Sequence, residues 1–187
     1  MKHLKHPKLF SFLAVTACTI LAATTPNARA ASATEMNQKA SQALHDLYAR
    51  SAAARNVGHH AKAVLVFPEI LKAGFIVGAQ HGDGVLFVHG HVGGYYKTVA
   101  ASYGLQAGAQ RFGYALFFMA GRDLAYLHKS GGWEIGSGPS VVIVDTGMAK
   151  SLTTTTLRKG VYAFAFGQRG LMAGLGLQGS KITEIHP

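Results

Sequence analysis

The stretch GLQAGAQRFGYALFF, residues 104–118, carries two glycines four residues apart at the start of a largely apolar run. Such spacing occurs where membrane helices touch, in phosphate-binding loops, and in strands that another group approaches closely. Gln106, Gln110 and Arg111 argue against a membrane helix, and the run lacks the lysine and the following helix of a phosphate loop. The stretch is therefore predicted to be a strand.

The same pattern occurs 30 residues earlier, where GFIVGAQH (residues 74–81) aligns with GLQAGAQR (residues 104–111), and a fainter copy begins at Gly170. Because side chains alternate between the faces of a strand, these glycines leave one face bare. A bare face weakens a sheet unless another part of the protein fills it. The sequence therefore predicts an α+β fold: a curved, glycine-rich antiparallel β-sheet or partial barrel, covered by aromatic side chains or by a leading N-terminal helix.

The glycine-free front of the chain has the pattern of that helix. Ser32 and Glu35 fit a capping box, small apolar residues then recur at helical spacing, and Gly58 is a natural end. All 23 glycines lie at or beyond Gly58. Residues 31–60 are thus predicted to be a helical segment of the same domain as a glycine-rich β body at residues 61–187.

Within the body, one clear internal helix is expected at residues 122–129. A brief helix is expected at residues 69–72, because proline suits a first helical turn and Pro68 precedes them. The remaining periodic segments are predicted as strands, with turns at residues 82–84 and near Gly90.

The first 30 residues have the pattern of an export signal, with a basic start, an apolar stretch at residues 9–23 and the cleavage motif Ala28-Arg29-Ala30. The apolar stretch is shorter than the roughly 20 residues needed to cross a bilayer. The run Val15-Thr16-Ala17-Cys18 also resembles a lipobox, which would place a lipid anchor on Cys18. The expected location is the periplasm or the cell envelope, with cleavage after Ala30 and lipidation at Cys18 as open alternatives.

The charge balance indicates the class of partner. The chain has a formal net charge of +10, of which the signal segment contributes four basic residues and no acid, leaving +6. In a cell envelope the abundant acidic partners are anionic lipid headgroups. No nucleic-acid partner is expected for an exported chain without a basic run. No cofactor is expected either. The pattern GLGLQG at residues 174–179 matches the dinucleotide-binding fingerprint, which needs a following helix and an acid about 20 residues further on, but only eight residues follow it.

Three kinds of candidate site follow from the side chains. The histidines His81, His89 and His91 lack the further ligand that a metal site needs, so they are interpreted as exposed hairpin residues. Glu134 and Asp145 are the two acids considered for catalysis, without a visible base or metal partner. The favoured site is a lipid-binding set around the front helix, which competes with an ordinary solvated face and comprises Lys39, Arg50, Arg55, His59, His60, Lys62 and Lys72.

The chain from residue 61 to residue 185 resembles the SYLF domain family. The resembling blocks include KAVLVFPEILKAGFIVGAQHGDGVL (62–86), GGYYKTVAASYGLQAGAQRFGYALFFM (93–119), GWEIGSGPSVVIVD (132–145) and a last block at residues 150–185. The resemblance implies a non-enzymatic domain that binds phospholipids, which are phosphoinositides in eukaryotic members. It assigns lipid contact to the basic N-terminal helical part, here Lys39, Arg50, Arg55 and Lys62. The actin binding of eukaryotic members is not expected of an exported bacterial protein.

The predicted function is therefore non-catalytic binding of anionic phospholipid at a bacterial envelope. Three alternatives remain at this point: a carrier that encloses an acyl chain, a small outer-membrane β-barrel, and an envelope hydrolase that uses Glu134 or Asp145. The lipid headgroup and the oligomeric state are left open by the sequence.

Overall fold

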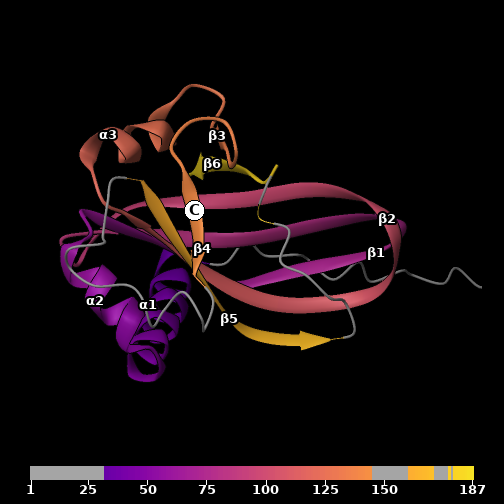
Figure 1. Ribbon diagram of the computed structural model, residues 1–187, viewed down its shortest axis with the longest axis horizontal. Helices are drawn as coiled ribbons and strands as arrows, with labels where there is room; N and C mark the ends of the chain where they lie inside the picture. The colour runs from indigo at the N-terminus through magenta and orange to yellow at the C-terminus, as the bar shows by residue number, and fades with distance from the viewer. Residues whose placement is uncertain (1–31, 145–159, 171–176, 178) are drawn as a thin grey trace, which may run out of the picture.

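The computed structural model describes residues 32–144, 160–170, 177 and 179–187 of the chain (Figure 1). Cys18, Asp145 and most of the fainter glycine copy that begins at Gly170 lie outside these residues. The described elements, in chain order, are α1 (Ala33–Arg50), α2 (Ala52–His60), β1 (Ala63–Val88), β2 (His91–Phe118), α3 (Gly121–Leu124), the 3₁₀-helix η1 (Ala125–His128), β3 (Trp133–Glu134), β4 (Val141–Val144), β5 (Val161–Gly170) and β6 (Lys181–Ile185).

The front of the chain forms two helices, where one was expected. The Ser32 hydroxyl caps α1 by accepting a hydrogen bond from the Glu35 amide, which confirms the predicted start. Ser51 ends α1 in an extended conformation, and its hydroxyl accepts from the Ala54 amide to begin α2. Gly58 does not end the helix, because α2 continues to His60.

The main feature of the fold is a long two-stranded ribbon. β1 and β2 pair antiparallel from Ala63↔Phe118 to Val88↔His91, around the predicted turn at Gly90, whose φ of +82° suits glycine. The brief helix expected at residues 69–72 and the turn expected at residues 82–84 are wrong, because both segments belong to β1. Pro68 lies at a register shift between Phe67 and Ile70, where it has no register partner on β2. Its missing amide hydrogen therefore removes no hydrogen bond from the ladder.

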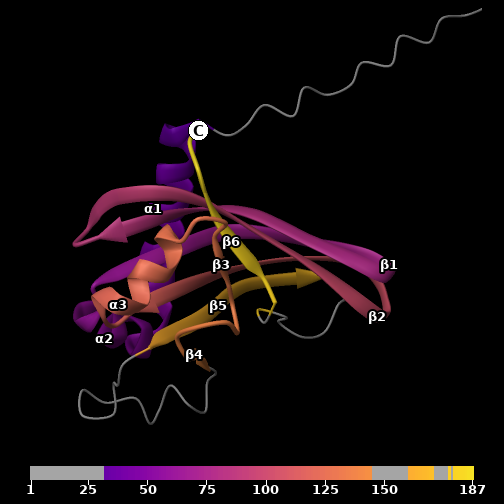
Figure 2. The ribbon, with the colours of Figure 1, turned by 90° about the horizontal axis from the view of Figure 1, so that it is seen from above.

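The ribbon folds over on itself at the repeated glycine pattern. Between the pairs Phe75↔Ala107 and Val77↔Tyr103, Ile76 of β1 stands opposite residues 104–106 of β2 without a register partner. A Cβ added at Gly84 would stand 2.7 Å from the Val66 carbonyl oxygen, so the returning half of β1 lies directly against the outgoing half. Figures 1 and 2 both show this bend at the end of the ribbon away from α1 and α2.

The remaining strands extend the folded ribbon into a curled sheet that forms a half-barrel. One half of β2 pairs with β5 and the other half with β6; β3 then pairs with β6, and β4 with β5. The predicted α+β class with a curved sheet is confirmed. The sheet is mixed and not wholly antiparallel, because β4 and β5 run parallel.

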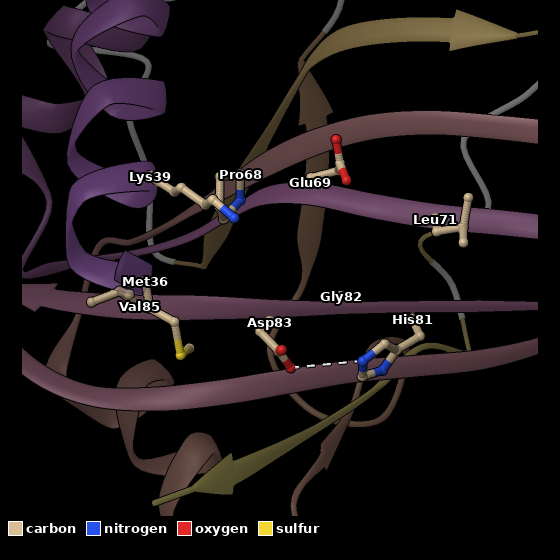
Figure 3. A pocket seen from close by; sticks show the side chains of 9 residues that line it. All are labelled: Met36, Lys39, Pro68, Glu69, Leu71, His81, Gly82, Asp83 and Val85. Atoms are coloured by element: carbon tan, nitrogen blue, oxygen red, sulfur yellow. Dashed lines mark ion pairs between the residues drawn. The ribbon is translucent and has the colours of Figure 1, made fainter. Parts of the chain in front are cut away.

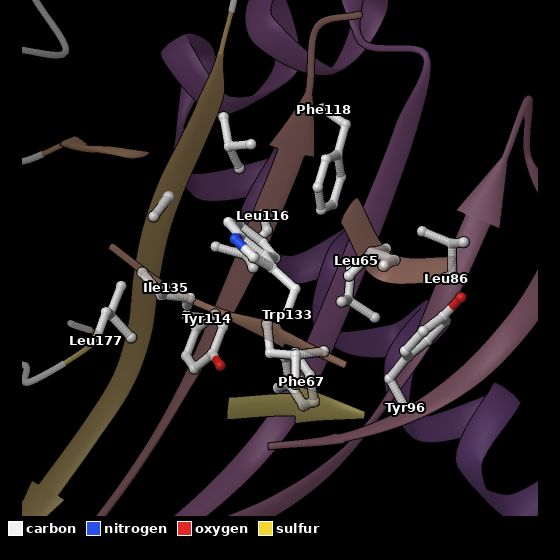
Figure 4. Packing of buried hydrophobic residues seen from close by; sticks show 14 of the residues in the cluster. Leu65, Phe67, Leu86, Tyr96, Tyr114, Leu116, Phe118, Trp133, Ile135 and Leu177 are labelled. Atoms are coloured by element: carbon white, nitrogen blue, oxygen red, sulfur yellow. The ribbon is translucent and has the colours of Figure 1, made fainter. Parts of the chain in front are cut away.

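Two hydrophobic clusters hold the sheet, one on each face. Inside the curl, aromatic and aliphatic residues of the ribbon pack under Trp133, as Figure 4 shows for Leu65, Tyr114 and Phe118. On the outer face, α1 and α2 cover a second cluster that includes Val66, Ala115 and Phe117, and Figure 2 shows α1 crossing the strands there.

Aromatic side chains cover two glycines outside the repeated pattern, whereas the nearest atoms to a Cβ added at Gly74 belong to the backbone of Gly78 and Val77. A Cβ at Gly113 would stand 2.3 Å from the Phe166 ring, and one at Gly84 would stand 2.6 Å from the Phe67 ring. These rings occupy the space that a larger residue would need, so the glycines allow aromatic packing against the strand backbone.

The internal helix expected at residues 122–129 is a short α-helix, α3, continued by the 3₁₀-helix η1. Asp123 within α3 is buried, and its carboxylate accepts a hydrogen bond from the Gly160 amide at 3.0 Å. This contact ties α3 to the start of β5. Among the described residues, no helix has the length and apolar character required to cross a membrane.

Candidate functional site

A pocket of about 530 Å³ lies where α1 and α2 meet the hairpin end of the ribbon. Its apolar floor consists of Leu44, Val64, Phe87 and the alanines between α2 and β1. Exposed cationic and titratable side chains stand at its mouth, namely His45, His59, Lys62 and His89. We refer to this site as the helix-end pocket. An apolar floor beneath a basic mouth suits an amphiphile with an anionic head.

Helical spacing brings the α1 side of this pocket together. Ser41, Leu44, His45 and Tyr48 occupy positions i, i+3, i+4 and i+7 of α1, so they share one face of the helix. The α2 side follows from the helix end at His60, after which the chain turns directly into β1 and places Lys62 beside the mouth. The β1 side comes from the hairpin turn, where His89 has a φ of +51°.

Tyr48 joins the two helices at the back of the pocket. A Cβ added at Gly58 would stand 2.3 Å from the Tyr48 hydroxyl oxygen, so glycine is required for this close approach. Arg55 donates a hydrogen bond from its guanidinium to the Tyr48 carbonyl oxygen. Burial raises the pKa of the Tyr48 phenol above its ordinary value, which further favours the neutral hydroxyl.

A second, smaller pocket of about 230 Å³ lies along the N-terminal half of α1, between Met36, Lys39 and β1 (Figure 3). Its charges are mixed, since Glu69 and Asp83 line it together with Lys39, and His81 lies 3.8 Å from the Asp83 carboxylate. Lys39 is paired with Glu35 at 2.7 Å, which holds the pKa of the Glu35 carboxyl below its ordinary value. This pocket therefore offers less uncompensated positive charge than the helix-end pocket.

The structure brings together only part of the basic set predicted from the sequence. His59 and Lys62 line the helix-end pocket, whereas Lys39 lines the smaller pocket. Arg50 is exposed at the end of α1, and the exposed His60 ring donates from Nδ1 to the Asn56 carbonyl oxygen at 2.8 Å. Arg55 holds the α1–α2 corner.

Lys72 does not belong with that basic surface. Its side chain is buried, with 5% of its area exposed, on the strand face that also buries Gln80 and Gln110. Lys72 pairs in register with Gln110 on β2. The expectation that Lys72 lies against a membrane with the helical residues is therefore wrong, because alternation along β1 turns it into the curl while its neighbour Leu71 faces out.

Two other candidate sites have a clear placement. His81, His89 and His91 do not form a metal site, since the described residues contain no group of three or more histidine, cysteine or acidic residues that could hold a metal ion. Glu134 is exposed on β3, opposite Lys181 of β6, and Asp145, the other acid considered for catalysis, lies outside the described residues.

Reasoning from the sequence did not identify His45, Tyr48 and Phe87 as pocket residues. Their helical or strand positions were predictable, but the pocket depends on how α1 lies across the ribbon. The available signal was the shared face of Ser41, Leu44, His45 and Tyr48 on α1. Comparison with protein-family models and with curated proteins finds no match to this chain.

Proposed function

We propose that this protein binds anionic phospholipid without catalysis, with the lipid headgroup at the mouth of the helix-end pocket. The observation that carries the proposal is the combination of Lys62 and three histidines around an apolar floor that includes Leu44 and Phe87. At the mouth, the lipid phosphate accepts hydrogen bonds and forms an ion pair with the positive charge. The first part of an acyl chain lies on the apolar floor.

The resemblance to the SYLF domain supports the same class of ligand. That resemblance assigns lipid contact to the N-terminal helical part, and α1 and α2 form one wall of the pocket. We further propose that the protein acts at the bacterial envelope, in keeping with the signal-like residues 1–30. The expected physiological ligands are then anionic glycerophospholipids such as phosphatidylglycerol and cardiolipin.

The proposal is tested by vesicle flotation with a charge-reversed pocket residue. The wild-type chain is expected to float with phosphatidylglycerol vesicles and not with phosphatidylcholine vesicles. Lys62→Glu removes a positive charge and adds a negative one at the mouth, so its apparent affinity should fall by about tenfold. Lys129→Glu makes the same charge change at the exposed end of η1, outside the pocket, and serves as the matched control.

At about 0.15 M salt the control should bind nearly as well as wild type, since charges further apart than about 8 Å are largely screened. Equal losses of vesicle affinity for Lys62→Glu and Lys129→Glu would show that only the net charge matters. That result would refute lipid binding in the helix-end pocket. Equal flotation of the wild type with both lipids would refute the preference for anionic lipid.

A further inference from the structure

The bend of the ribbon exposes a compact apolar tip. Phe75, Ile76 and Val77 are consecutive and are 74%, 42% and 61% exposed, and Leu71, on the outward face of β1, is 46% exposed. We call these four residues the apex. A run of three exposed apolar residues is costly to solubility and is retained where it has a function.

The apex belongs to the sheet face that is covered elsewhere. Near the hairpin, the outward residues Val66 and Val85 are buried beneath the helices. The outward positions continue along β1 to Leu71 and Val77, which are exposed. Figures 1 and 2 place the bend at the far end of the ribbon from α1 and α2. The apex is therefore a projecting apolar end of the same surface.

Ile76 adds a second, independent observation. Its φ is +63°, in the left-handed region that β-branched residues strongly disfavour. Glycine adopts this conformation without cost, and glycines stand two residues away on each side, at Gly74 and Gly78. The sequence thus places a strained and exposed isoleucine at a position of the bend that suits glycine. Strain of this kind is concentrated at functional sites.

The charges beside the apex indicate what it contacts. Leu71 pairs in register with Arg111, which in turn pairs with Arg169 of β5, and both arginines are exposed. The acids near them are Glu69, with an Arg111–Glu69 separation of 3.7 Å, and Asp83, which lines the smaller pocket together with Glu69 and Leu71. Apolar residues next to exposed arginines match the acyl boundary and the anionic headgroups of a lipid surface.

The form of the apex also favours a bilayer over a second protein. A stable protein interface needs a broad complementary surface of about 800 Å² on each partner. On β1, the described apolar surface of the bend is the three consecutive side chains of Phe75, Ile76 and Val77, with Leu71 four residues before them. A fluid lipid interface adapts to such a tip, whereas a protein partner needs a groove built to receive it.

We propose that the apex inserts into the headgroup and upper acyl region of an anionic lipid bilayer, with Arg111 and Arg169 at the level of the phosphates. This inference rests on the proposed function, because it supplies the membrane contact of a lipid-binding protein. The inserted depth is about 5–10 Å, as for other interfacial apolar surfaces. The helix-end pocket lies at the other end of the ribbon, roughly 36 Å away for the 11 residues from Val77 to Val88. The two contacts can therefore be removed separately.

Tryptophan quenching by nitroxide-labelled lipid tests this proposal. Phe75→Trp places an indole at the apex of the full chain, in anionic vesicles whose lipids carry the nitroxide near the headgroup or deep in the chain. Trp133, the single native tryptophan, is 1% exposed inside the curl, so wild type provides the baseline. Ile143→Trp is the control, because Ile143 is an exposed apolar residue (44%) on β4, outside the apex.

The expected result is at least twofold quenching of the Phe75→Trp signal by shallow nitroxide, weaker quenching by deep nitroxide, and none for Ile143→Trp. Phe75→Asp should lower the apparent vesicle affinity by about tenfold. Its folding is checked by the unchanged near-ultraviolet signal of Trp133.

Of the four outcomes below, three would overturn the insertion of the apex and one would overturn only lipid binding in the pocket. If the chain floats with anionic vesicles while Phe75→Trp is not quenched, the apex is not inserted and lipid binding by the pocket stands. If Phe75→Trp is quenched but Lys62→Glu binds as wild type does, the apex proposal stands and the pocket fails. A chain that does not float at all refutes both. A blue shift of the apex indole that grows with protein concentration without vesicles would assign the apex to a second copy.

Discussion

Gly74 and Gly78 approach each other so closely across the bend of β1 that a Cβ on Gly74 would stand 2.2 Å from the Cα of Gly78. Gly74 also pairs in register with Gly108 of β2, whose φ is +133°. The repeated glycine pattern therefore marks the position at which both strands of the ribbon bend. It lets 26- and 28-residue strands fold into a curled sheet.

Gly74→Ala should destabilise the protein by at least about 2 kcal/mol, because the added methyl group meets backbone that cannot rotate away. The measurement is the free energy of unfolding in urea. Gly121→Ala is the control, since a Cβ there has no neighbour within 4 Å, and it should change stability by less than about 0.5 kcal/mol. Similar small effects for both variants would contradict the role of Gly74 in the bend.

Ile76→Gly is expected to raise stability while weakening membrane binding. Removing the left-handed isoleucine relieves strain, for a gain of about 1 kcal/mol after the extra backbone entropy of glycine is counted. The loss of its exposed side chain should at the same time reduce vesicle affinity by a few fold. Urea unfolding and flotation of the same preparation measure both effects. A variant that loses stability would show that the isoleucine is retained for packing.

Tyr96→Phe should be neutral or stabilising. The Tyr96 hydroxyl is buried and has no hydrogen-bond partner among the described residues. Such an unsatisfied group costs about 1–3 kcal/mol, which phenylalanine avoids with the same ring. Tyr114→Phe is the matched contrast, because its hydroxyl donates to the Thr98 hydroxyl at 3.1 Å and its loss should be destabilising. Urea unfolding of both variants gives the comparison, and a larger loss for Tyr96→Phe would contradict it.

Alkaline pH should destabilise the protein through the same tyrosines. Burial, assisted by nearby Glu184, raises the pKa of Tyr96 from 10.0 to about 12; burial also raises the pKa of Tyr114. Below pH 10 the phenols are protonated in both states, so they impose no pH dependence. Between pH 10 and about 12 the unfolded chain loses the Tyr96 proton more readily, so the free energy of unfolding falls as pH rises. Tyr96→Phe should flatten this fall, and an unchanged slope would show that other groups cause it.

Local signals in the sequence predicted the elements whose causes are local. Ser32 caps α1, Gly90 closes the hairpin, and a short apolar run predicted the strand at residues 63–67. The segments at residues 69–72 and 82–84 were mistaken because proline and glycine signals are also compatible with a bulge or a close approach within a strand. Ladder pairing with β2 decided between these choices, and it is a long-range interaction.

The candidate site was predictable only in part for the same reason. The sequence indicated a basic helical front, and it drew attention to His59 and Lys62. It did not indicate that the pocket floor would include Phe87, because this contact depends on how the helices lie across the ribbon. Lys72 was misplaced because its segment was expected to be helical. In the strand that forms instead, successive side chains point to opposite faces of the sheet, and that of Lys72 points inward.

Binding of anionic phospholipid in the helix-end pocket is tested most directly by titrating the folded protein with short-chain phosphatidylglycerol below its micelle concentration. The titration is followed by backbone amide NMR. The predicted result is saturable shifts clustered at Tyr48, Gly58, Lys62 and Gly90 around the helix-end pocket. Short-chain phosphatidylcholine should produce much smaller shifts at the same amides. Shifts of equal size with both lipids, or shifts that avoid these four amides, would contradict binding of anionic phospholipid in this pocket.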